Sequence, residues 1–146
     1  LEFRRVLFRS SQSDKETVRK LKMIGHYIGM SFQIIDDVLD FTSTEKKLGK
    51  PVGSDLLNGH ITLPILLEMR KNPDFKLKIE QLRRDSERKE FEECIQIIRK
   101  SDSIDEAKAV SSKYLSKALN LISELPDGHP KSLLLSLTKK MGSRNT

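Results

Sequence analysis

Apolar residues recur at intervals of three or four along most of the chain, which is the spacing that collects them on one face of an α-helix. The first such run extends from Ser13 to about Asp40, and Ser13 and Glu16 have the spacing of a capping box at its start. Its apolar stripe consists of Leu21, Ile24, Ile28, Ile35 and Leu39. The pattern predicts one long helix that is buried along much of its length.

Two glycines, Gly25 and Gly29, lie one turn apart inside this predicted helix. Each costs about 1 kcal/mol relative to alanine in a helix interior. We therefore expect another helix or a ligand to approach the helix closely at these positions.

The periodic pattern stops between Thr42 and Gly59. This stretch is polar, carries lysines, and is punctuated by Gly49, Pro51 and Gly53. We predict a surface loop that follows directly on the end of the helix, where a scaffold can position it for function.

Helical spacing returns beyond the loop. It predicts a helix from Leu63 to about Lys71 with Pro64 in its first turn, then a short helix capped by Asp74. A further helix is predicted from about Ser86 to Arg99.

The last part of the chain continues the helical pattern. Ser103 and Glu106 have the spacing of a second capping box, which opens a longer helix that ends at Pro126-Asp127-Gly128. A final helix begins at about Pro130, and its predicted buried residues are Leu133, Leu134, Leu137 and Met141. The predicted fold class is all-α.

Composition narrows the possible functions. The chain has 146 residues, with 27 basic and 21 acidic side chains and a formal net charge of +6, a size that suits one domain or a piece of a larger protein. Because basic and acidic residues are interleaved, a solvated surface is favoured over a nucleic-acid-binding face, although the positive balance also suits anionic diphosphates. No apolar run is long enough to span a membrane. The single Cys94 lies in an apolar helical stretch, which indicates a core residue and fits a reducing cytoplasm.

Residues 1–10 differ in character from the polar segment that follows them. Arg4, Arg5 and Arg9 stand among large apolar residues, and the sequence does not begin with Met. We interpret this segment as a non-native or artefactual lead, and we expect residues 11–146 to carry the fold.

An acidic stripe ends the first predicted helix. Helical spacing places Gln33, Asp36 and Asp40 on one side, with Asp37 flanking them. These carboxylates repel one another and face the negative end of the helix dipole, so both effects favour a bound cation. Hard oxygen ligands suit Mg²⁺, which commonly shares one or two carboxylates with substrate phosphates. The alternative interpretation is a solvated acidic face.

The stripe belongs to a longer motif. The sequence reads Gly25-xxx-Gly29-xx-Phe32-Gln33-xx-Asp36-Asp37-x-Leu39-Asp40, then Leu48-Gly49-Lys50-Pro51-xx-Ser54-Asp55-Leu56-xx-Gly59-x-Ile61-Thr62-Leu63-Pro64. This run resembles the second aspartate-rich region of the trans-isoprenyl (polyprenyl) diphosphate synthases. It is most similar to bacterial medium- and long-chain members, such as the catalytic component of heptaprenyl diphosphate synthases. The resemblance implies the C-terminal half of an isoprenoid-synthase-type helical bundle.

The resemblance also implies roles for individual residues. Asp36 corresponds to the principal Mg²⁺ ligand of this half-site, and Asp37 and Asp40 would coordinate the ion directly or through water. Gln33 and Lys50 match residues that hold the allylic diphosphate, and the Lys50 ammonium can reach a diphosphate as a point charge. His60 occupies a diphosphate-binding position where many members carry lysine, so a permanent positive charge there is in doubt.

The implied activity is head-to-tail condensation of isopentenyl diphosphate with an allylic diphosphate. The product is a medium- or long-chain polyprenyl diphosphate, as used for the side chain of isoprenoid quinones such as menaquinone. Members are cytoplasmic, in some cases at the membrane periphery, and work as homodimers or as heterodimers with a small regulatory subunit. Because family members carry an earlier aspartate-rich motif that this chain lacks, we expect the chain alone to be inactive.

Three other functions compete with this one. A non-catalytic regulatory or interaction subunit would keep the helical bundle without needing the acidic triplet or Lys50. A nucleic-acid binder would need its lysines and arginines on one face. A terpene cyclase shares the metal and diphosphate chemistry, but its second metal motif usually mixes Asn, Ser and Glu.

Overall fold

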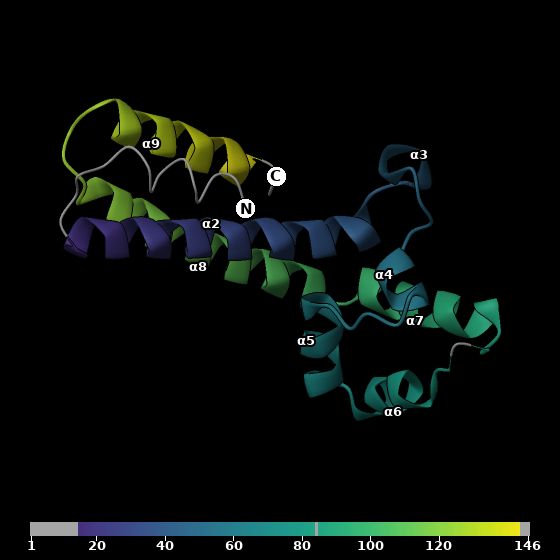
Figure 1. The fold of residues 1–146 in the computed structure, drawn as a ribbon. Coiled ribbons are helices and arrows are strands. Elements are labelled where there is room, and N and C mark those ends of the chain that lie inside the picture. The colour runs from purple at the N-terminus through teal and green to yellow at the C-terminus, as the bar shows by residue number, and fades with distance from the viewer. Residues whose placement is uncertain (1–14, 84, 144–146) are drawn as a thin grey trace. The chain divides into compact units, whose positions relative to one another are not determined.

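The chain folds into helices joined by short connections (Figure 1). The computed structural model describes residues 15–83 and 85–143, and every regular element in these ranges is a helix, as predicted. The helices are α2 (Lys15–Thr42), α3 (Glu45–Leu48), α4 (Ser54–Leu57), α5 (Leu63–Lys71), α6 (Pro73–Gln81), α7 (Arg88–Lys100), α8 (Ser103–Ser123) and α9 (His129–Gly142). Ser13 and the predicted artefactual lead, residues 1–10, lie outside the described residues.

The chain divides into two compact units. The first contains Leu1–Gln33 and Val110–Thr146, so its described part holds most of α2, most of α8 and all of α9. Its core joins these three helices through Ile24, Ile122, Leu125 and Leu134, flanked by Leu21, Ile28, Leu121 and Leu135. The predicted apolar stripe of the first helix therefore packs as expected.

A buried hydroxyl pair also joins α2 to α8 inside the first unit. Ser31 Oγ and Ser111 Oγ lie 2.6 Å apart, and Ser111 Oγ also donates to the backbone oxygen of Ser31 at 3.2 Å. Because both residues are fully buried, each hydroxyl needs a partner inside the protein.

The second unit runs from Ile34 to Ala109. Within it α5, α6 and α7 contact one another (Figure 1). Its buried apolar residues include Ile34, Ile35, Val38, Phe41, Leu56, Ile65, Phe75, Ile79, Phe91, Cys94, Ile95, Ile98, Ile104 and Ala107. Cys94 is a core residue as predicted, and burial raises the pKa of its thiol above the ordinary value.

Two predicted caps are wrong. Asn72, not Asp74, caps α6, because its side-chain oxygen accepts from the Phe75 amide at 3.0 Å. Pro73 takes the first helical position, so the cap falls on the residue before the proline. The second predicted capping box does not form either, since Ser103 Oγ donates to Glu68 at 2.7 Å instead.

Two expectations about packing are met only in part. Of the predicted buried residues of α9, Leu134 is buried and Leu137 and Met141 are half-buried, whereas Leu133 is 48 % exposed, so the prediction was wrong for Leu133. A β-carbon placed on Gly25 or on Gly29 would meet no atom within 4 Å. No described helix therefore packs closely against these glycines, and the approach of a ligand stays a prediction.

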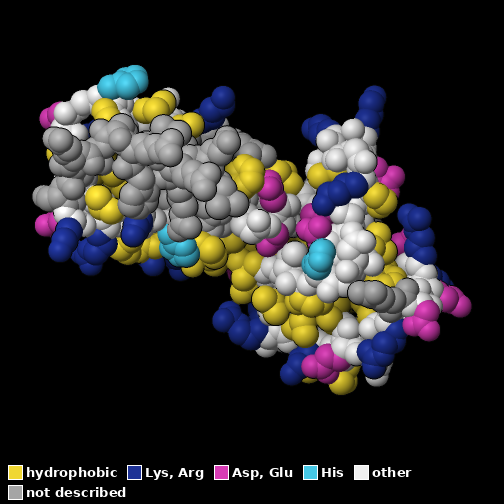
Figure 2. Space-filling model, viewed as in Figure 1, with side chains coloured by type: hydrophobic (Ala, Val, Ile, Leu, Met, Phe, Trp, Pro, Cys, Tyr) yellow, Lys and Arg dark blue, Asp and Glu magenta, His cyan; other side chains and the backbone are white. Residues whose placement is uncertain are grey.

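The surface bears on the nucleic-acid alternative. On the face drawn in Figure 2, lysine and arginine side chains are scattered among acidic ones and form no single basic stripe. This distribution disfavours the nucleic-acid alternative. In the ranges that the structure covers, no helix combines the length and the apolar character needed to cross a membrane.

Candidate functional site

The acidic residues of the predicted motif lie at the C-terminal end of α2. Asp36 is half-buried, whereas Asp37 is 8 % exposed and Asp40 is 1 % exposed. Gln33 is exposed and precedes Asp36 by three residues on the same helix. The solvated-face interpretation is therefore wrong for Asp37 and Asp40, because buried carboxylates require specific partners.

Asp40 is the centre of a polar cluster that joins α2 to the loop after it. Lys50 Nζ lies 3.0 Å from Asp40 Oδ1. Ser54 Oγ donates to the same oxygen at 2.9 Å, and the backbone amide of Asp55 donates to Oδ2 at 3.2 Å. The Gly53 amide also donates to the backbone oxygen of Asp40 at 2.9 Å. Four groups from residues 50–55, which lead into the start of α4, thus converge on one residue of α2.

The loop can take this path because of Gly53. This residue has φ +71°, in the left-handed region that favours glycine, and it directly precedes α4. A β-carbon there would overlap the Cγ1 and Cδ1 atoms of Ile95, which projects from α7. Backbone conformation and close packing together explain why this chain has glycine at position 53.

Lys50 is held by the cluster but remains accessible. Its side chain is 44 % exposed, and its ammonium also lies 3.4 Å from Asp55 Oδ1. The hydrogen bond to Asp40 raises the pKa of Lys50 above its ordinary value, and attraction to Asp40 and Asp55 adds to this against the effect of burial. Lys50 is therefore a permanent cation at neutral pH, suited to binding an anion from solvent.

The carboxylates do not form a ready-made metal site. Among residues 15–83 and 85–143, no three His, Cys, Asp or Glu side chains lie close enough to hold an ion together. Both oxygens of Asp40 already accept hydrogen bonds from the loop. The carboxylates fit an ion that is bound by Asp36 and whose remaining ligands are water and substrate oxygens. This is the usual pattern for Mg²⁺.

His60 lies on the connection between α4 and α5. Its side chain is exposed, and its backbone amide donates to the backbone oxygen of Asp55 at 2.8 Å. This hydrogen bond connects the backbone at His60 to Asp55, which also contacts Lys50 and Asp40.

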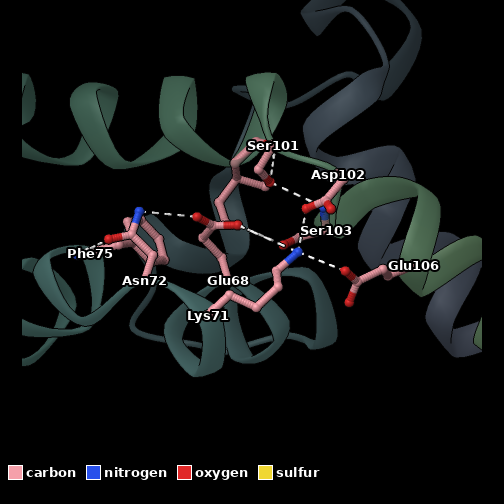
Figure 3. A network of polar contacts seen from close by, with 9 residues as sticks. Glu68, Lys71, Asn72, Phe75, Ser101, Asp102, Ser103 and Glu106 are labelled. Atoms are coloured by element: carbon pink, nitrogen blue, oxygen red, sulfur yellow. Dashed lines mark hydrogen bonds and ion pairs between the residues drawn. The ribbon is translucent and has the colours of Figure 1, made fainter.

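A second polar cluster was not predicted from the sequence (Figure 3). The buried carboxylate of Glu68 on α5 accepts from Ser103 Oγ at 2.7 Å and from Asn72 Nδ2 at 3.1 Å. Burial alone would raise the pKa of Glu68, but these hydrogen bonds, with Ser101 and Lys71 nearby, outweigh it and lower that pKa. The burial of Glu68 could have been predicted from its spacing, because it lies three and four residues after Ile65 and Pro64 and so shares their buried face of α5.

Lys71 extends this second cluster at the surface. Its ammonium pairs with Asp102 and lies 2.7 Å from Glu106 Oε1. Hydrogen bonding to Asp102 raises the pKa of Lys71, and the same contact lowers the pKa of Asp102. The cluster fastens α5 to the start of α8, and we interpret it as structural.

Comparison with known proteins decides the family. The profile of the family described as Polyprenyl synthetase matches residues 4–98. The chain belongs to the polyprenyl synthetase family. It is 44 % identical over 135 residues to heptaprenyl diphosphate synthase component 2 of Bacillus subtilis, a match that covers 92 % of this chain and 38 % of that protein.

Solved structures agree with this family assignment and with the predicted all-α bundle. The crystal structure of heptaprenyl diphosphate synthase from Staphylococcus aureus matches with a TM-score of 0.89 and 99 % identity, over 94 % of this chain and 43 % of that one. The polyprenyl synthase of Caulobacter crescentus, complexed with calcium and isoprenyl diphosphate, matches with a TM-score of 0.76 and 28 % identity, over 92 % and 42 % of the two chains. The chain spans about two-fifths of the length of these members of the polyprenyl synthetase family.

Proposed function

We propose that the chain forms part of a prenyltransferase that joins isopentenyl diphosphate to an allylic diphosphate, head to tail. The product would be a medium- or long-chain polyprenyl diphosphate for an isoprenoid quinone such as menaquinone. One observation carries this proposal: Lys50 is an exposed cation fixed at the end of the helix that bears Asp36. Family membership and the heptaprenyl synthase relatives support it.

In the proposed reaction, the bond between the allylic carbon and the diphosphate oxygen breaks first. The double bond of isopentenyl diphosphate then attacks the allylic cation, and the new cation loses a proton, which the released diphosphate accepts. Bound Mg²⁺ would neutralise charge on the departing diphosphate. Lys50 would donate hydrogen bonds to the diphosphate oxygens as negative charge develops on them, which is where a fixed cation accelerates the step.

The other site residues have supporting roles in this proposal. The Asp36 carboxylate would supply the protein oxygen for Mg²⁺, and Asp37 would contribute directly or through water. Gln33 would donate its amide to the allylic diphosphate, with His60 as a further contact at the loop. The calcium and isoprenyl diphosphate in the Caulobacter crescentus complex support a divalent cation beside a diphosphate.

A protein partner is also part of the proposal. The Bacillus subtilis relative is named as component 2 of its synthase, which implies a further component. We propose that the full-length protein works with a small second subunit or as a homodimer. We expect the 146-residue chain alone to be inactive, because its described residues form only the Asp36 and Lys50 part of a site.

The test is Mg²⁺-dependent incorporation of labelled isopentenyl diphosphate onto farnesyl diphosphate. The full-length Staphylococcus aureus enzyme is a suitable host, because it contains a segment 99 % identical to this chain. It would be assayed alone and with its candidate partner component, beside Asp36→Ala and an exposed control substitution, Glu80→Gln. Loss of product with Asp36→Ala but not with Glu80→Gln is expected.

The assay also distinguishes prenyl transfer from the regulatory-subunit alternative. If the wild-type protein makes no product under either condition, prenyl transfer is wrong. A non-catalytic regulatory subunit then becomes the better explanation. The number of isoprene units in any product would show which polyprenyl diphosphate the enzyme makes.

A further inference from the structure

We propose that Asp40 is a positioning residue for Lys50 and its loop, and that it is not a ligand of the metal. This inference rests on the proposed prenyl transfer, because it assigns a role within the same site. It divides the acidic motif into two parts. Asp36 faces the ion and the substrate, whereas Asp40 organises the protein around them.

The first argument is that both carboxylate oxygens of Asp40 already accept hydrogen bonds from the protein. Oδ1 receives Ser54 Oγ at 2.9 Å and Lys50 Nζ at 3.0 Å, and Oδ2 receives the Asp55 amide at 3.2 Å. The carboxylate is 1 % exposed, so a hydrated ion would have to displace these donors to reach it. Mg²⁺ gives up its own water reluctantly, which makes such an exchange unfavourable.

The second argument is electrostatic. The Lys50 ammonium already neutralises the charge of Asp40 at 3.0 Å. A divalent cation bound to the same carboxylate would lie within a few ångströms of that ammonium and would repel it in a partly buried setting. Asp36 is half-buried and lies four residues, about one helical turn, before Asp40, so an ion could bind to it without breaking the pair between Asp40 and Lys50.

The third argument is that the donors to the Asp40 carboxylate come from one short segment, residues 50–55. Its backbone oxygen accepts from Gly53, and its side chain accepts from Lys50, Ser54 and Asp55. A side chain that only bound metal would not need to hold Lys50, Ser54 and Asp55 together. The arrangement fixes where the Lys50 ammonium lies before any substrate arrives, which reduces the cost of ordering that side chain on binding.

The first experiment measures the loop without metal. Amide hydrogen exchange of residues 49–57 would be followed in the full-length Staphylococcus aureus enzyme in the presence of a chelator. Asp40→Asn should accelerate exchange in this segment about tenfold, because it replaces one of the two acceptor oxygens by an NH2 group and removes the charge, so the side-chain amide can no longer accept from Ser54, Lys50 and Asp55 together. Ser54→Ala should accelerate it less, and the matched variant Asp36→Asn should leave it unchanged.

The second experiment separates metal binding from substrate binding. Mg²⁺ titrations of activity should show a higher midpoint for Asp36→Asn and an unchanged midpoint for Asp40→Asn. Asp40→Asn should instead raise KM for farnesyl diphosphate about tenfold, an effect expected when a charged contact is lost. In a Lys50→Gln background, Asp40→Asn should add nothing to KM, because it acts through Lys50.

Some outcomes would overturn the inference. An Mg²⁺ midpoint that rises as much with Asp40→Asn as with Asp36→Asn would make Asp40 a metal ligand. Equal exchange rates in the wild type and Asp40→Asn would remove its role in the loop, and additive effects of Asp40→Asn and Lys50→Gln on KM would remove its link to Lys50. A wild-type enzyme without prenyltransferase activity would instead reject the proposed function, and the exchange experiment would still test the loop.

Discussion

Lys50 and Asp40 form an ion pair with 3.0 Å between Nζ and Oδ1, although the lysine side chain is 44 % exposed and the aspartate side chain is 1 % exposed. A surface ion pair is usually weak, because both side chains remain mobile in water. Here one partner is fixed in the protein interior by two further hydrogen bonds. The pair therefore works as an anchored cation at the end of α2.

The first prediction concerns the loss of the Lys50 charge. Lys50→Gln should raise KM for farnesyl diphosphate about 10- to 100-fold and lower kcat, because charge-assisted hydrogen bonds to a diphosphate are lost. Steady-state kinetics in the full-length Staphylococcus aureus enzyme would measure this. Lys47→Gln, an exposed position on α3, serves as the control and should behave as the wild type. Equal kinetics for both variants would rule out the role of Lys50.

Gly53 predicts a stability effect at the same loop. Gly53→Ala would strain a backbone with φ +71° and would also press a methyl group against Ile95. Gly49→Ala has a similar φ, +68°, but its added methyl group would meet nothing within 4 Å. Gly53→Ala should therefore cost about 1 to 3 kcal/mol more than Gly49→Ala, by the usual cost of overpacking. Urea denaturation of both variants would measure the difference, and equal losses would show that packing against Ile95 is unimportant.

Local rules predicted much of the fold. The predicted bounds of α5, Leu63 to Lys71, agree with the structure, because Pro64 and the polar Asn72 mark its two ends. The long α2 and the burial of Cys94 also followed from helical periodicity. These features depend on neighbours in sequence, which a pattern can represent.

Contacts between distant residues could not be predicted in this way. The sequence placed Asp40 in an acidic stripe, but its partners Ser54 and Asp55 follow 14 and 15 residues later. Ser103 had the spacing of a capping residue, yet a buried carboxylate 35 residues away takes its hydroxyl. Tertiary partners compete with local caps wherever a buried charge needs hydrogen bonds.

Glu68 predicts a pH-dependent stability. Its pKa in the folded protein lies below the ordinary value of 4.5, so its ionised form stabilises the fold above pH 4.5, and this contribution is lost as pH falls through the lowered pKa. Glu68→Gln should cost about 1 to 3 kcal/mol near pH 7, because Ser103 and Asn72 lose a charged acceptor. Urea unfolding at several pH values should show this difference shrinking below pH 4.5. Glu80→Gln, an exposed control, should change little, and a pH-independent cost for Glu68→Gln would contradict the prediction.

The buried hydroxyl pair of the first unit predicts non-additive substitutions. Ser111 donates to the Ser31 backbone oxygen at 3.2 Å, so the hydrogen between the two hydroxyl oxygens, 2.6 Å apart, belongs to Ser31. Ser31→Ala leaves the Ser111 hydroxyl with an acceptor, whereas Ser111→Ala leaves the Ser31 hydroxyl without its partner. We therefore expect Ser111→Ala to lower the free energy of unfolding by about 1 to 3 kcal/mol, and Ser31→Ala to lower it less.

The double variant is the decisive measurement for this pair. Ser31→Ala with Ser111→Ala removes both hydroxyls, so no buried donor is left unpaired, and replacing both partners by apolar groups is close to neutral. Its cost should be smaller than the sum of the two single costs, and smaller than that of Ser111→Ala alone. A double-mutant cycle by urea denaturation would measure the coupling. Additive costs would mean that the two hydroxyls stabilise α2 and α8 independently, in spite of their 2.6 Å separation.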